Sequence, residues 1–136
     1  MKYLSLISRI LLVLMFLLSG ISKISDFGWT VAMASSVGIP MANIAIVLAI
    51  IIEIGGAVFV ILGGKYATSG ALLLALFTLV ASYYFHAFWM LPKDAQMIQM
   101  IMFMKNMSVT GGLLFVAAHY MDKCMVMNCI CTAKKK

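Results

Sequence analysis

Residues 86–112 read HAFWMLPKDAQMIQMIMFMKNMSVTGG, a short polar hinge between two apolar flanks. The hinge is Pro92-Lys-Asp94, and the flanks nevertheless contain His86, Gln99 and Lys105. Ionisable and amide side chains are expensive in hydrocarbon, so within membrane segments they usually mark a function or a specific contact. The stretch predicts two membrane helices that meet at the hinge and share a polar site.

The composition of the chain is that of a membrane protein. Of its 136 residues, 65% are hydrophobic and 10% are charged, whereas a soluble domain is about 45–50% apolar and about 25% charged. The net charge is +6, and the positive residues are few, scattered along the chain and most frequent near its ends. Because this distribution fits the positive-inside rule better than a basic patch, we expect no nucleic-acid partner.

Four apolar segments reach the length of about 20 residues that crosses a bilayer, at about 4–24, 42–62, 67–91 and 97–120. Each must be a helix, since an open strand would leave backbone groups unpaired in lipid. We expect an all-α, four-helix antiparallel membrane bundle over residues 1–122, followed by a short basic tail at 123–136. The first segment resembles a signal peptide without an A-x-A site, and we expect it to be retained.

Lysine and arginine gather on one side of this predicted bundle, namely Lys2, Arg9, Lys65, Lys123 and the lysines at 134–136. The other side has only Lys23 and Lys93. Both termini are therefore expected in the cytoplasm, with the protein in a bacterial inner membrane. The outer segment after Asp26 is either a short interfacial helix that ends at Gly38, or an irregular loop anchored by Trp29.

Each predicted span has one polar or small-residue face at about 100° per residue. The second span places Ala49, Glu53 and Ala57 on one line, and the fourth places Gln99, Asn106 and Thr110 together with Lys105 beside them. If the four faces converge, the outer half of the bundle contains a polar cluster with Lys23 at its mouth. Its members are Glu53, His86, Gln99, Lys105 and Asn106.

Glu53 and Lys105 would neutralise each other in such a cluster. Two interpretations stay open: a buried ion pair that only fixes helix register, or a polar cavity that binds a small polar or quinone-type headgroup. His86 is either a satisfied interior histidine or a group that exchanges protons. Trp89 is either an interfacial belt residue or a surface for stacking a flat ligand.

Three cysteines, Cys124, Cys129 and Cys131, lie close together in the predicted tail. Soft sulfur ligands suit Cu(I) and zinc, but C-x4-C-x-C is not a standard zinc spacing. These residues are weak metal candidates, and reduced or acylated cysteines in a cytoplasmic tail explain them better. We therefore predict no metal site.

The polar residues also resemble the DoxX family of small bacterial membrane proteins over roughly residues 5–119. The resemblance rests on the order of Ser19-Gly20 with Lys23, Glu53 with Gly55-Gly56, the HAFW sequence at 86–89, the FMKN sequence at 103–106, and Gly111-Gly112. It implies a four-helix inner-membrane protein associated with redox chemistry, since one relative is named as a thiosulfate:quinone oxidoreductase subunit. Ala87 stands where many members have a polar residue, which removes one candidate proton carrier.

We therefore expect an accessory or quinone-interacting component of a membrane redox system. Glu53 and Lys105 would hold a headgroup, and His86 would exchange its proton. Such a chain would be an oxidoreductase subunit rather than an autonomous enzyme, with a protein partner in the complex and no known cofactor beyond a possible quinone. A small transporter or exporter component, a ligand-free scaffold and a homo-oligomer remain open.

Overall fold

The computed structural model describes the backbone of residues 2–133 and the side chains of residues 3–123. Its elements are α1 (Lys2–Ser25), α2 (Phe27–Ser36), α3 (Ala42–Leu62), α4 (Gly64–Phe85), the 3-10 turn η1 (Phe88–Met90) and α5 (Lys93–Ala133). Four of the helices are long and apolar enough to cross a membrane, and the described residues contain no strand. The expected all-α bundle of four spans is confirmed.

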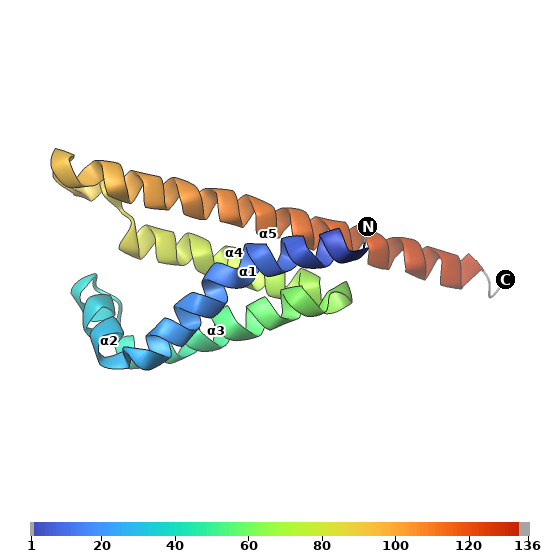
Figure 1. Cartoon of the computed structure of the whole chain (residues 1–136), viewed down its shortest axis with the longest axis horizontal. Coiled ribbons are helices and arrows are strands. Elements are labelled where there is room, and N and C mark those ends of the chain that lie inside the picture. The colour runs from blue at the N-terminus through green and yellow to red at the C-terminus, as the bar shows by residue number, and fades with distance from the viewer. Residues whose placement is uncertain (1, 134–136) are drawn as a thin grey trace.

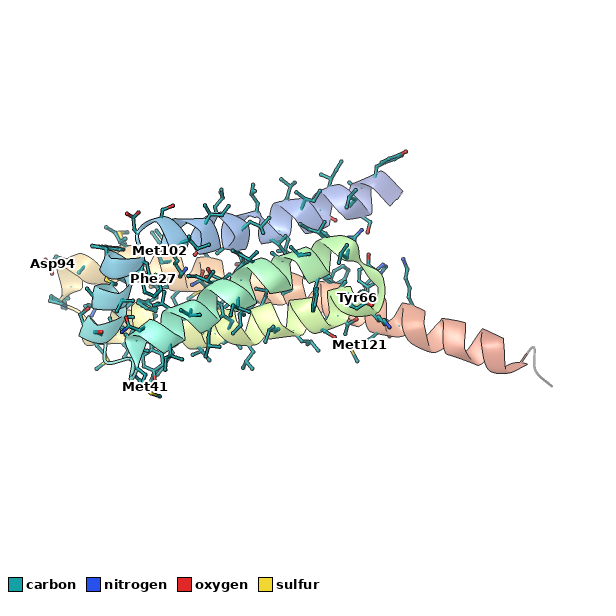
Figure 2. The ribbon with its side chains drawn as sticks, turned by 90° about the horizontal axis from the view of Figure 1, so that it is seen from below. Phe27, Met41, Tyr66, Asp94, Met102 and Met121 are labelled. Atoms are coloured by element: carbon teal, nitrogen blue, oxygen red, sulfur yellow. The ribbon has the colours of Figure 1, made fainter. Side chains whose placement is uncertain are left out.

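The four long helices pack in the order α1, α3, α4, α5, each against the next. α1 and α5 touch only sparsely, so the bundle is incompletely closed along that side. α2 and the α4–α5 connection lie at one end, whereas α1 begins and α5 ends toward the other (Figure 1). Figure 2 places Met41 and Asp94 at the first end, here named the Pro92 end, and Tyr66 at the second, the Lys65 end.

Small residues let α3 and α4 approach closely. A Cβ at Gly70 would lie 2.7 Å from the carbonyl oxygen of Gly56, and a Cβ at Gly56 would lie 2.8 Å from Leu74. Membrane helices associate largely through such close packing, because lipid tails are as apolar as the side chains that face them. The α3–α4 hairpin is therefore closely packed, and a larger residue at either glycine would force the helices apart.

The central core is apolar and draws on all four long helices. Val13 comes from α1, Val60 from α3, Leu74 from α4 and Leu113 from α5, and all four are fully buried. The buried polar residues, such as Glu53, sit on the same inward faces. The predicted convergence of the faces is thus largely correct.

The segment after Asp26 is the short helix α2, not an irregular loop. Asp26 occupies its N-cap position but makes no side-chain capping bond. The helix ends at Ser36 with Val37 as its C-cap, two residues before the predicted Gly38. Gly38 has φ +82, and the Ile39 amide donates to the Ala34 carbonyl. This is a Schellman ending, in which glycine adopts the left-handed conformation without a Cβ penalty.

The last two spans differ from their predicted bounds. α4 ends at Phe85, and η1 carries the chain on to Met90. α5 begins at Lys93 and continues to Ala133, well past the expected end of the span near residue 120. At 1.5 Å per residue α5 is about 60 Å long, roughly twice the hydrocarbon thickness, so part of it must project beyond a bilayer.

Candidate functional site

An ion pair joins α1 to α3 inside the spanning region. Lys23 Nζ lies 3.0 Å from both carboxylate oxygens of Glu53 and close to Ser19 Oγ. Ser19 Oγ also donates to Glu53 Oε1 at 3.2 Å. The Glu53 side chain is only 5% exposed and that of Lys23 is 20% exposed. Each charge is therefore neutralised by the other, as burial in hydrocarbon requires.

The predicted partnership of Glu53 with Lys105 is wrong. Lys105 is exposed, and among the described residues its ammonium has one recorded hydrogen bond, to the sulfur of Met102 at 3.5 Å. The physical reason is the order of the helices. α5 packs on α4, whereas the Glu53 face of α3 is covered by α1. Lys23, expected only at the mouth of the cluster, is the true counter-charge.

His86 and Gln99 form a second polar contact, at the Pro92 end. His86 Nδ1 lies 2.7 Å from Gln99 Oε1. Because an amide oxygen can only accept, Nδ1 donates the hydrogen in this contact and Nε2 points away from it. Both side chains are half-buried. The predicted proximity of these two residues is confirmed, and their bond ties the last turn of α4 to α5.

Aromatic rings surround the turn that follows His86. The ring centroid of Trp89 lies 5.1 Å from that of Phe88, 5.8 Å from Phe103 and 6.3 Å from Tyr83. Trp89 is 49% exposed, so the cluster has an open side. Phe103 follows Gln99 by one helical turn, which places the rings next to the His86–Gln99 contact on the same face of α5.

Asn106 forms a third polar contact, buried between α4 and α5. Its amide donates to Ser82 Oγ at 2.9 Å, and the Ser82 hydroxyl donates to the Thr78 carbonyl at 2.7 Å. Thr110 likewise bonds the carbonyl of Asn106, one turn away. Among the described residues no fully buried side-chain nitrogen or oxygen lacks a partner, which favours a structural role for Asn106.

Three contributors were not among the predicted site residues, although Ser19 and Phe103 belong to the motifs of the family resemblance. Each of Ser19, Ser82 and Phe103 stands four residues along the chain from a predicted site residue, namely Lys23, His86 and Gln99. The i, i+4 spacing was the available signal. Hydroxyl and phenyl groups are common in membrane helices, so spacing alone does not separate them from ordinary packing residues.

The structure does not describe the side chains of Cys124, Cys129 and Cys131, so the weak metal hypothesis lies outside the described residues. Within the described part, no group of three or more His, Cys, Asp or Glu residues is placed to hold a metal ion.

The fold and these contacts define a class: a small integral membrane protein whose four spans carry interior polar pairs. Comparison with known proteins assigns a family within this class, because the DoxX family profile matches residues 4–87. The inner membrane protein YphA of Escherichia coli K12 is 35% identical over 82% of this chain and 79% of its own length. YqjF of the same organism is 32% identical over 82% and 80%. No solved structure matches. The chain belongs to the DoxX family and is an integral inner-membrane protein.

Proposed function

We propose that this chain is an accessory subunit of a membrane redox system and that it binds a quinone at the Pro92 end. The observation that supports this is the His86–Gln99 hydrogen bond beside the half-exposed ring of Trp89. A membrane location supports it too, because quinones reside in the bilayer.

The residues at this end fit the chemistry of a quinone headgroup. A flat ring needs an apolar or aromatic surface, which Trp89 and Phe103 offer. Its carbonyl oxygens need a hydrogen-bond donor, which His86 provides when protonated. Small-molecule sites generally combine an apolar wall with a few placed polar groups, and the Pro92 end has both.

When bound, a quinone would supply a ring that takes up two electrons and two protons. His86 would hold a proton at Nε2 and release it toward the ring, while Gln99 keeps Nδ1 hydrogen-bonded and the imidazole oriented. The two electrons would come from a protein partner, and the second proton from water at this end of the bundle. In this proposal Lys23 and Glu53 hold α1 on α3 and take no part in binding.

The chain provides its own reporter for a binding test, since it contains two tryptophans, Trp29 and Trp89. In a Trp29→Phe background, a short-chain quinone analogue titrated into protein in nanodiscs should quench Trp89 fluorescence with saturation. His86→Leu should weaken that quenching about tenfold or more, through loss of one directed hydrogen bond in a dry site.

Two controls accompany the titration. In the chain that keeps Trp29, Trp89→Phe leaves Trp29 as the only tryptophan, and its fluorescence should show no saturable quenching. In the Trp29→Phe background, His119→Leu removes the chain's other histidine and should leave the quenching of Trp89 unchanged. Quenching that rises linearly in all variants would contradict quinone binding. Proton-dependent solute uptake into vesicles, lost in Lys23→Met, would instead favour a transporter.

A further inference from the structure

A groove opens between α1 and α5 at the Lys65 end, away from the proposed quinone site. Figure 2 shows α1 diverging from α5 toward its first residues. The two helices meet where Gly112 faces Leu12, since a Cβ at Gly112 would lie 3.1 Å from a Leu12 methyl group. From there they enclose a volume of about 980 Å³, at the upper end of the range for small-molecule sites.

Two positive charges converge in this groove. Arg9 Cζ and Lys123 Nζ each lie 5.6 Å from the centre of the Tyr120 ring, so both cations make a cation–π contact with the same ring. Neither forms an ion pair with a carboxylate among the described residues, where the Lys23–Glu53 pair is the salt bridge found. The two charges are therefore at most about 11 Å apart, and two like charges at this range without a carboxylate partner favour an anion near both.

Arg9 is fixed in position but keeps donors free. Its Nη1 donates to the carbonyls of Val60 at 3.2 Å and Ile61 at 2.8 Å, and its Nε donates to Ser5 at 3.1 Å. The guanidinium thereby caps the carboxyl end of α3. Among the described contacts Nη2 has no partner, so its two hydrogens remain available to an anionic oxygen.

The walls of the groove are apolar and face the lipid. Leu4 is 72% exposed and Phe115 is 75% exposed, and Leu12 and Val116 line the deeper part. A ligand that matches this site has an anionic head and long apolar chains. Basic pockets between membrane helices bind the headgroups of anionic lipids.

We propose that the α1–α5 groove binds one anionic phospholipid. Its phosphate lies between Arg9 and Lys123, and its acyl chains follow Leu12 and Phe115. The lipid completes the side of the bundle that the protein itself leaves open.

Native mass spectrometry of the delipidated full chain can test this, by titration with phosphatidylglycerol and, separately, with zwitterionic phosphatidylcholine. Phosphatidylglycerol should bind as a single tight adduct and phosphatidylcholine at least tenfold more weakly. Lys123→Gln should lower the phosphatidylglycerol affinity about fivefold, as expected for one cation near a lipid phosphate. Lys65→Gln is the matched control, because Lys65 is an exposed lysine at the same end whose ammonium lies over Tyr66, outside the groove.

A second variant blocks the groove without changing its charge. Ser8 lines the groove and is exposed, so Ser8→Trp should fill the space and lower the affinity at least tenfold. Equal binding of both lipids, equal losses in Lys65→Gln and Lys123→Gln, or an unaffected Ser8→Trp protein would each overturn the proposal. A lipid-free dimer that excludes phosphatidylglycerol would overturn it as well, by assigning the groove to a second copy of the chain.

Discussion

At the scale of single residues, the Lys23–Glu53 pair shows how a charge is accommodated within a membrane span. Each partner supplies the opposite charge, and Ser19 satisfies a further carboxylate lone pair. Removing one partner of a buried pair costs more than removing both, because the remaining charge is left uncompensated.

We therefore predict that Glu53→Gln lowers the free energy of unfolding by about 1–3 kcal/mol. This loss is smaller than that of a fully buried pair, because Lys23 is 20% exposed and water can partly solvate its charge. The Lys23→Met/Glu53→Gln double variant should recover most of that loss. Thermal unfolding of both variants in the same detergent measures the difference. Additive losses would contradict a direct pair.

Asn106 allows a second prediction at this scale. Its bond to Ser82 joins α4 and α5 away from water, and such interhelical bonds contribute about 0.6 kcal/mol on average and up to about 1.7 kcal/mol. A double-mutant cycle of Asn106→Leu and Ser82→Ala should give a coupling energy in that range.

Lys105→Met serves as the neighbouring control in this cycle. Lys105 is exposed and its recorded hydrogen bond goes to Met102, not to Ser82, so its coupling to Ser82→Ala should be close to zero. A coupling equal to that of Asn106 would mean that the measured energy reports a general change in α5.

At the scale of helices, the α3–α4 interface is sensitive to side-chain volume. Gly70→Leu would drive a side chain into the Gly56 carbonyl, 2.7 Å from where its Cβ must lie. We predict a loss of about 3 kcal/mol or more, or failure to fold, since overpacking alone costs about 1–3 kcal/mol.

Gly55→Ala is the matched control, because nothing lies within 4 Å of a Cβ at that helical position. It should be neutral or stabilising by up to about 1 kcal/mol through the higher helix propensity of alanine. Thermal unfolding of both variants distinguishes local overpacking from a general intolerance of change in α3 and α4.

At the scale of the whole molecule, four spans place the start of α1 and the end of α5 on one side of the membrane. The lysine and arginine distribution predicts that this side is the cytoplasm. A reporter active only outside the cytoplasm should work when inserted at Pro92 and fail when inserted at Lys65 or after Lys123. The reverse pattern would contradict the predicted orientation.

The sequence by itself determined the class of fold. Four apolar segments of membrane length allow little besides four helices, since lipid leaves no other way to pair backbone groups. Periodicity also identified the inward faces that carry Glu53, Asn106 and Thr110, because burial of a helix repeats every 3.6 residues.

Only the tertiary structure decided which faces meet. Helical periodicity fixes the direction of a side chain about its own axis but not which neighbouring helix lies there. Glu53 therefore pairs with Lys23 on α1, while Lys105 stays exposed on α5, beyond α4. The groove that gathers Arg9 and Lys123 over Tyr120 depends on the divergence of α1 from α5, which is a property of packing and left no local pattern in the sequence.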